Sequence, residues 1–184
     1  MSNLINKESM LIKEEKANEE LCIAKYEKGI KEAKDPELKQ LFSSILEHEK
    51  QHLTSLNRIL NGDVPDIEKE SQSQQNSNQG GSQSSSNNGF NNSQFNMYQN
   101  QMNSNFGMET ASEITPNENF HEDCTLCQDA LSTEKYISSS YNSTIFECLD
   151  TNIRKVLNHI QKEEQEHGEQ ISNYMLSHGY AQVK

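Results

Sequence analysis

Two stretches of the chain, residues 4–62 and 122–178, carry the same pattern of residues at a constant distance of 115 positions, the distance from Glu19 to Glu134. At this distance the two stretches align without a gap. The paired residues are Glu19 with Glu134, Tyr26 with Tyr141, Asp35 with Asp150, Glu49 with Glu164, and His52 with His167. A pattern that returns at a fixed distance indicates two copies of one supersecondary unit.

Each unit has the hydrophobic periodicity of two consecutive helices. Apolar residues recur at steps of three and four in both halves of a unit, which is the spacing of one helix face. Asp35-Pro36 and Asp150-Thr151 separate the halves, and Asp followed by Pro is typical of a helix start. Asn61-Gly62 and His178-Gly179 place a glycine where helices commonly end. The sequence therefore predicts an all-α protein made of two repeated helical hairpins.

Residues 63–121, between the two units, have a different composition. Residues 71–108 contain no charged residue and consist mainly of Ser, Asn, Gln and Gly with a few aromatic residues. A segment of this kind buries too little apolar surface to offset the entropy of ordering, so we predict a disordered linker. Asn- and Gln-rich segments with aromatic residues also self-associate. The interpretation as an assembly segment therefore stays open beside that of a flexible connection.

The predicted linker is long enough to run back along the length of a helix. Helices 2 and 3 would then be parallel, and the two hairpins would form one four-helix bundle. A long crossover between helices 2 and 3 is the arrangement of ferritin-like folds. We predict a first hairpin at residues 4–62, a low-complexity linker at 63–121 and a second hairpin at 122–178, with both hairpins in one bundle.

Six polar residues lie on the apolar faces of the predicted helices. Each unit supplies a lone glutamate and a Glu-x-x-His pair: Glu19, Glu49 and His52 in the first, Glu134, Glu164 and His167 in the second. Four buried carboxylates without partners would be costly and would repel one another. Two divalent cations, Fe or Mn, would neutralise them, and imidazole nitrogens would complete the coordination. We predict a dinuclear metal site at these residues; a polar core without metal is the alternative.

The expected coordination follows from the repeat. Glu49 and Glu164 would bridge or flank the ions, Glu19 and Glu134 would bind terminally, and each histidine would hold one ion. His48 lies beside the apolar face and Glu163 on another face, so neither is included among the ligands.

Two further pairs of residues are candidates for chemistry. Tyr26 and Tyr141 would be hydrogen-bond donors to the ligands or radical traps, or would pack in the core with a satisfied hydroxyl. Cys124 and Cys127 have the CxxC spacing of a thiol pair, but a structural zinc site needs a second pair. A disulfide, an intermolecular crosslink and two reduced thiols stay open for them.

Charge and hydropathy restrict the partners. The net charge of −12 argues against nucleic-acid binding, which needs clusters of basic residues. The sequence contains no apolar run of about 18 residues, so we expect no membrane span. It also has no cleavable signal near its start, so we expect a soluble protein that is not exported.

The ligand pattern of the two units resembles that of the ferritin-like superfamily, rubrerythrins included. The second unit is most similar to the Coat F family of endospore coat proteins. The similarity is carried by Leu131-Ser-Thr-Glu-Lys135, Tyr141-Asn142, Glu147-Cys148, Arg154, Glu163-Glu164, Tyr174-Met175 and His178-Gly179-Tyr180. The resemblance implies a spore coat protein of an endospore-forming bacterium, made in the mother-cell cytoplasm. The chain departs from rubrerythrins, which carry two CxxC pairs, because it has one.

Three functions follow from these observations. The first is a structural protein of the spore coat, with other coat proteins as partners, a dinuclear metal site, and a homodimer if two chains exchange hairpins. The second is a di-iron or di-manganese oxidase, peroxidase or catalase-like enzyme that protects against reactive oxygen. The third is a helical adaptor without metal. The family resemblance favours the first.

Overall fold

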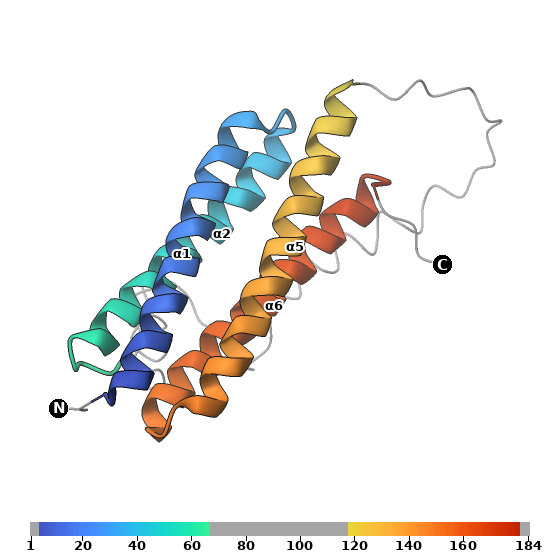
Figure 1. The fold of residues 1–184 in the computed structure, drawn as a ribbon. Coiled ribbons are helices and arrows are strands. Elements are labelled where there is room, and N and C mark those ends of the chain that lie inside the picture. The colour runs from blue at the N-terminus through green and yellow to red at the C-terminus, as the bar shows by residue number, and fades with distance from the viewer. Residues whose placement is uncertain (1–3, 67–117, 181–184) are drawn as a thin grey trace, which may run out of the picture.

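The computed structural model describes residues 4–66 and 118–180. These residues form four helices: α1 (Asn6–Glu32), α2 (Pro36–Leu60), α5 (Glu118–Glu147) and α6 (Thr151–Ser177). Helices α1 and α2 form one hairpin and α5 and α6 a second, and the two hairpins lie side by side along their length (Figure 1). The predicted all-α bundle of two helical hairpins is confirmed.

The second helix of each hairpin begins at the predicted aspartate. The Asp35 carboxylate accepts a hydrogen bond of 2.8 Å from the backbone N–H of Glu37, and Pro36 occupies the first helical position. The Asp150 carboxylate accepts bonds of 2.7 and 3.2 Å from the N–H groups of Asn152 and Ile153. Both caps satisfy N–H groups that have no partner within the helix.

Glycine ends the same two helices. Gly62 has a φ of 79° and Gly179 a φ of 71°, a left-handed conformation that residues with a Cβ rarely adopt. Helix α2 ends at Leu60 and α6 at Ser177, so both glycines lie directly after the last turn, as the sequence predicts.

The contacts between hairpins show how the helices run. Lys7 pairs with Glu147 at one end of α1 and α5, and Lys34 pairs with Glu122 at the other, so these helices are antiparallel. Because α2 is antiparallel to α1, α2 and α5 are parallel, and α2 ends at the opposite end of the bundle from the start of α5 (Figure 1). The end of α2 and the start of α5 are thus placed as in ferritin-like folds, where a long crossover joins helices 2 and 3. Most of the predicted linker, residues 67–117, lies outside the described residues.

The apolar core consists of two clusters at different levels of the bundle. On α2, Leu38, Phe42 and Ile45 belong to one cluster, and Leu56 and Ile59 belong to the other. Glu49 and His52 lie between these two groups in the sequence of α2. The same order holds on α6, where Glu164 and His167 separate Ile160 from Ile171. A polar layer therefore divides the core near mid-length.

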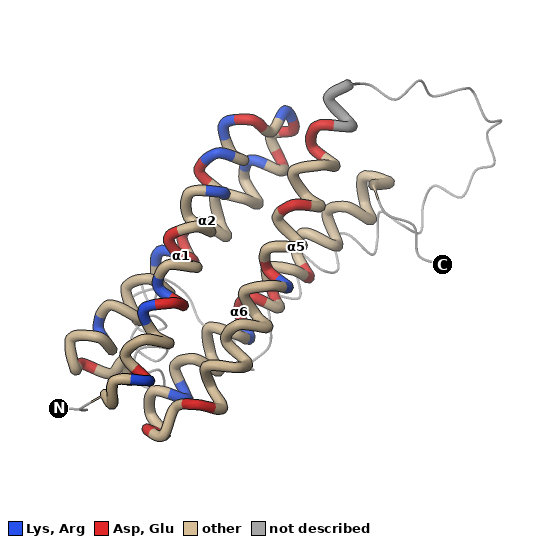
Figure 2. The backbone as a smooth tube through the Cα atoms, viewed as in Figure 1, with Lys and Arg blue, Asp and Glu red and all other residues tan. Residues whose placement is uncertain are grey.

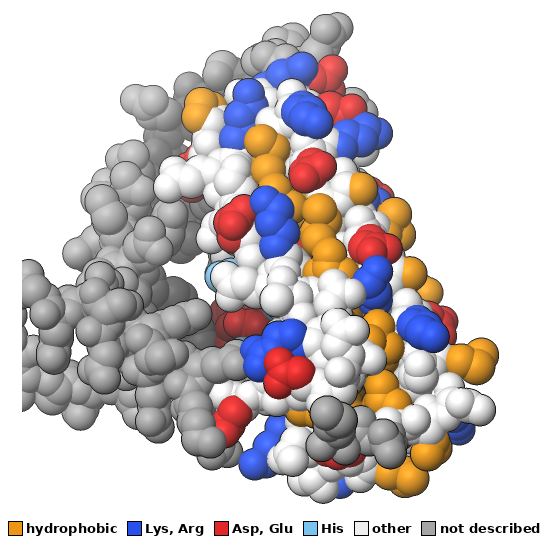
Figure 3. All heavy atoms as spheres, turned by 90° about the vertical axis from the view of Figure 1, so that its left-hand side faces the viewer, with side chains coloured by type: hydrophobic (Ala, Val, Ile, Leu, Met, Phe, Trp, Pro, Cys, Tyr) orange, Lys and Arg blue, Asp and Glu red, His pale blue; other side chains and the backbone are white. Residues whose placement is uncertain are grey.

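The outer faces of the helices are charged, as amphipathic helices require. Acidic and basic residues are distributed along the helices (Figure 2). On the face at the left in Figure 1, a line of hydrophobic side chains runs between charged side chains of both signs (Figure 3). Within residues 4–66 and 118–180, no helix has the length and apolar character that a membrane crossing requires.

Candidate metal centre

The structure brings the six sequence-predicted residues together in the polar layer. We call them the central cluster: Glu19 from α1, Glu49 and His52 from α2, Glu134 from α5, and Glu164 and His167 from α6. The spacing of three residues places each Glu-His pair on one helix face. The most exposed of the six residues, His52, has a relative exposure of 2%. All six are therefore shielded from water.

Three carboxylates of the central cluster surround the Nδ1 atom of His52. This nitrogen lies 2.9 Å from Oε1 of Glu164, 3.7 Å from Oε2 of Glu19 and 3.8 Å from Oε2 of Glu49. One ligand atom from each residue lies within 4.8 Å of the others, which is close enough for them to share one metal ion. We call this set the His52 position.

A second set surrounds the Nδ1 atom of His167. This nitrogen lies 3.1 Å from Oε1 of Glu49 and 3.6 Å from Oε2 of Glu134. With Glu164, these residues again offer four ligand atoms within 4.8 Å of one another. We call this set the His167 position. Glu49 and Glu164 belong to both positions, whereas each remaining residue belongs to one.

Hydrogen bonding provides a test of whether cations fit here. Among the residues that the structure describes, eight buried side-chain nitrogen and oxygen atoms have no hydrogen-bond partner of adequate geometry. All eight belong to the central cluster: Glu19 Oε2, Glu49 Oε1 and Oε2, His52 Nδ1, Glu134 Oε2, Glu164 Oε1 and Oε2, and His167 Nδ1. Buried polar atoms are normally paired, so this set is exceptional. Carboxylate and imidazole donors that converge in this way suit two Fe or Mn ions.

Without a cation, burial and mutual contacts shift the pKa values of the glutamates and histidines of the central cluster. Burial raises the pKa of Glu19 to about 7 and raises the pKa of Glu164 well above its usual value. Burial acts against the charge of Glu49 as well, but its contacts with His167 and His52 outweigh burial and lower its pKa. Contacts with carboxylates, acting against burial, raise the pKa of His167 to about 9 and that of His52 well above its usual value. Protons therefore take the place of cations, and metal binding would displace them.

Both candidate tyrosines contact the central cluster from the opposite hairpin. The Tyr26 hydroxyl donates a hydrogen bond to Oε1 of Glu134, and the Tyr141 hydroxyl donates one to Oε1 of Glu19. Each lone glutamate thus has one oxygen held by a tyrosine and one directed into the cluster without a partner. The tyrosines orient the two terminal carboxylates.

The outward nitrogen of each histidine meets a side chain that the sequence analysis left out. The Nε2 atom of His52 lies 3.0 Å from Oε2 of Glu163, and the Nε2 atom of His167 lies 3.1 Å from Nδ1 of His48. His48 and Glu163 are themselves 115 positions apart, so the repeat contains the signal that pairs them. They were missed because neither lies on the apolar face of its own helix.

Three other carboxylates are buried for a different reason. Glu15 accepts hydrogen bonds from Ser140 Oγ (2.9 Å) and Asn18 Nδ2 (3.1 Å), and from the Thr144 hydroxyl. In the same way, backbone N–H groups of the helix connections donate to Glu8 and Asp123. Neutral donors satisfy these side chains, so a buried carboxylate in this protein does not by itself indicate a cation.

The CxxC residues are free thiols in the structure. Cys127 is buried, and burial raises its pKa to about 12, which makes it a weak nucleophile. Cys124 is half-buried and accepts a hydrogen bond of 3.6 Å from Gln128.

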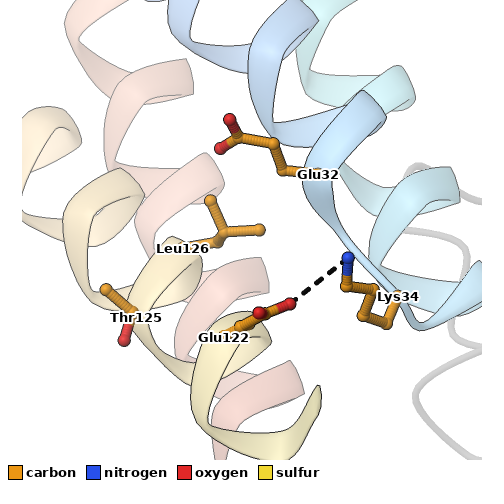
Figure 4. Close-up of a pocket in the computed structure, with 5 residues that line it drawn as sticks. All are labelled: Glu32, Lys34, Glu122, Thr125 and Leu126. Atoms are coloured by element: carbon orange, nitrogen blue, oxygen red, sulfur yellow. Dashed lines mark ion pairs between the residues drawn. The ribbon is translucent and has the colours of Figure 1, made fainter. Parts of the chain in front are cut away.

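Two hollows lie between α1 and α5. The larger, about 460 Å³, is lined by Glu32, Lys34, Glu122, Thr125 and Leu126 (Figure 4). Glu122 points toward Lys34 and pairs with it at 3.3 Å. At ~1.5 Å per residue, Glu122 is about 18 Å from Glu134 along α5, so this hollow is remote from the central cluster. The smaller hollow, about 30 Å³, is lined by residues that include Tyr26, Gly29 and Ala130.

Comparison with known proteins matches each of the two hairpins to a different family model. Residues 122–184 match the family model of the Coat F domain, and residues 2–60 match that of Rubrerythrin. The two matches support assignment to the Coat F and ferritin-like group that the sequence patterns indicated. No curated protein and no solved structure matches the chain.

Proposed function

We propose, for a chain that joins a rubrerythrin-like hairpin to a Coat F domain, that the protein is a structural component of the spore coat whose bundle holds two Fe or Mn ions. The Coat F match supports the place in the spore coat. The Rubrerythrin match and the geometry of the central cluster support the metal site.

One observation carries the metal site: eight buried polar atoms without a hydrogen-bond partner converge on two positions. Leaving such atoms unpaired costs roughly 1–3 kcal/mol each, more for charged groups. Two dications neutralise four carboxylates, and the i, i+3 pairs on α2 and α6 offer a nitrogen to each position. The central cluster thus has the charge, the donor atoms and the exclusion of water that two cations need.

Each residue then has a stated part in binding. Glu49 and Glu164 belong to both positions and would contribute ligand atoms to both cations. Glu19 and Glu134 each serve one position through the oxygen that is not held by a tyrosine. The histidines present Nδ1 to the cluster, which requires the proton of the neutral ring to lie on Nε2.

Elemental analysis tests the metal site. Full-length protein purified without chelators from cells supplied with Fe and Mn should contain two ions per chain. The double variant Glu49→Gln/Glu164→Gln should lose both, because these residues serve both positions. The matched control Glu47→Gln/Glu169→Gln changes exposed residues on the same helices and should retain both ions. Folded wild-type protein with no bound Fe or Mn would overturn the proposal.

Localisation tests the place in the spore. We propose synthesis in the mother-cell cytoplasm, followed by assembly with other coat proteins, with residues 63–121 as the assembly segment between the hairpins. A fluorescent fusion should surround the developing spore, and deletion of residues 71–108 should reduce its incorporation. A wild-type fusion that stays in the mother cell would contradict the coat assignment.

The second candidate function, a di-iron or di-manganese oxidase, peroxidase or catalase-like enzyme, has support from the hollow beside Tyr26. At about 30 Å³ it accepts a molecule of the size of water or peroxide, and Tyr26 leads from it to Glu134. Bound Fe or Mn would supply one-electron chemistry with O₂ or peroxide. The tyrosine hydroxyls would hold protons next to the terminal carboxylates. Loaded protein that consumes peroxide no faster than the Glu49→Gln/Glu164→Gln variant would exclude this function.

A further inference from the structure

The two halves of the candidate centre are related by the repeat, but their outer partners differ. His52 and His167 both direct Nδ1 into the central cluster and Nε2 away from it. Position 163 of the second hairpin is Glu, and the equivalent position 48 of the first hairpin is His. Since each of these residues contacts the histidine of the opposite hairpin, His52 meets a carboxylate at 3.0 Å and His167 meets an imidazole at 3.1 Å.

The two kinds of partner act differently on a ligating histidine. When Nδ1 binds a cation, Nε2 carries the proton and donates it to its partner. A carboxylate acceptor fixes this tautomer and adds a negative charge that makes Nδ1 a stronger donor to the metal. A neutral imidazole acceptor fixes the tautomer without the charge. The Glu163 side chain is only partly exposed, so solvent does not fully screen its charge. Its other neighbour is Nε2 of His159, at 3.5 Å, whose side chain is more exposed.

A second asymmetry lies on α1 and α5. Glu15 is buried one helical turn before Glu19, and the equivalent residue before Glu134 is Ala130. The hydroxyls of Ser140 and Thr144 bond to Glu15 beside Tyr141, whose hydroxyl contacts Glu19. Helix α1 therefore has an additional buried carboxylate one turn before Glu19, whereas α5 has only the methyl group of Ala130 one turn before Glu134.

We propose that the two cation positions are inequivalent and that the His52 position binds the first divalent cation. This proposal rests on the proposed metal site. Both asymmetries place additional negative charge near the His52 position, and partners of ligating residues typically change metal affinity 10–100-fold. At low metal supply the protein would hold one ion, at the His52 position, and it would become dinuclear only when the supply rises.

The test compares the two positions one at a time. Stepwise affinities of the wild type do not identify the first position, because Glu49 and Glu164 are shared and the first ion weakens the second at either position. Glu134→Ala leaves the four ligands of the His52 position complete, and Glu19→Ala leaves those of the His167 position complete. Full-length variants, stripped of metal and verified as helical by circular dichroism, are titrated with Mn²⁺ in a calorimeter.

We expect Glu134→Ala to bind one Mn²⁺ at least about 10-fold more tightly than Glu19→Ala. Equal affinities in the two variants, or the reverse order, would overturn the inference and leave the proposed metal site standing. Absence of Mn²⁺ binding to folded wild type would overturn both.

A second comparison isolates the outer partner. In the Glu134→Ala background, Glu163→Gln keeps a hydrogen-bond acceptor near His52 but removes its charge, and it should weaken Mn²⁺ binding about 10-fold. Glu169→Gln, an exposed neutralisation on the same helix, is the matched control and should leave the affinity unchanged. Electron paramagnetic resonance of wild type with one equivalent of Mn²⁺ should show an isolated ion; a coupled pair at that loading would contradict the proposal.

Discussion

The carboxylate of Glu15 and those of the central cluster are equally buried, but they are stabilised in opposite ways. Glu15 lies between α1 and α5 with two hydroxyls and an amide as donors. Glu49 and Glu164 have no donor of adequate geometry on any of their four oxygens. The difference shows that the donors around a buried acid, and not burial alone, distinguish a structural carboxylate from a candidate metal ligand.

The largest expected difference between Glu15 and the central cluster is in the effect of their substitution on the thermal stability that metal binding provides. At an ion concentration of 100 times Kd, binding stabilises the fold by about 2.7 kcal/mol per site, so two sites correspond to a Tm increase of at least about 10 °C. Thermal unfolding of stripped and Mn²⁺-loaded protein measures this increase. The Glu15→Gln variant should retain this increase and the Glu49→Gln/Glu164→Gln variant should lose it. An equal increase in both variants would contradict the assignment of Glu49 and Glu164 as metal ligands.

The pH dependence of the metal-free protein should show the next largest effect. The raised pKa of Glu19, about 7, means that the folded state keeps a proton that the unfolded state releases near pH 4.5, so stability falls as pH rises between these values. His167, with a pKa of about 9, stabilises the fold below pH 6.5, and this contribution is lost as pH rises to 9. The lowered pKa of Glu49 contributes a constant amount above pH 4.5.

We therefore expect urea unfolding of the metal-free protein to show a loss of at least about 2 kcal/mol between pH 5 and pH 9. With Mn²⁺ the decline should disappear, because cations hold the ligands deprotonated. Stability that rises with pH in the metal-free protein would contradict the assigned environments of Glu19 and His167.

Removal of the Glu15 carboxylate should lower the free energy of unfolding by about 2 kcal/mol, with or without metal. Glu15→Ala leaves the hydroxyls of Ser140 and Thr144 without their acceptor. Glu14→Ala removes the same charge from the exposed face of α1 and is the control. Urea unfolding of both variants measures the difference, and a Glu15→Ala variant as stable as its control would show that these hydrogen bonds contribute nothing.

Tyr26 and Tyr141 each donate to one oxygen of a lone glutamate whose other oxygen has no partner. Their substitution should have the smallest effect on stability. Tyr26→Phe removes the hydrogen bond from Tyr26 to Glu134 and should lower the stability of the metal-free protein by about 0.5–1 kcal/mol. Tyr136→Phe alters an exposed tyrosine on α5 and should be neutral. Chemical unfolding checks both, and equal stability of the two variants would mean that the Tyr26 hydroxyl does not hold Glu134.

Local sequence rules were sufficient for the helices and for the composition of the polar layer. Asp35 and Asp150 begin their helices because an aspartate cap needs only the next few residues. Glu49 and His52 share one face because three residues make nearly one helical turn. The repeat then distinguished these acids from the many others, since a coincidence at one helix does not recur at the same distance in a second.

Partners across the bundle could not be predicted in this way. Tyr26 and Tyr141 were candidates, but that each donates to the lone glutamate of the opposite hairpin depends on how α1 and α5 pair. Glu163 was assigned to another face of its helix, yet it reaches His52 because α6 packs against α2. The two hydroxyl donors to Glu15, from Ser140 and Thr144, also come from α5, so periodicity within α1 could not identify them.

The residues that enter the interior could be identified from the sequence alone, because hydrophobic periodicity and helix caps are properties of neighbours along the chain. The tertiary structure decided which buried acids find donors and which face one another, because hydrogen-bond partners in a bundle come from different helices. For this protein that decision separates Glu15, held by hydroxyls, from Glu19, one turn later, which directs an unpaired oxygen into the central cluster.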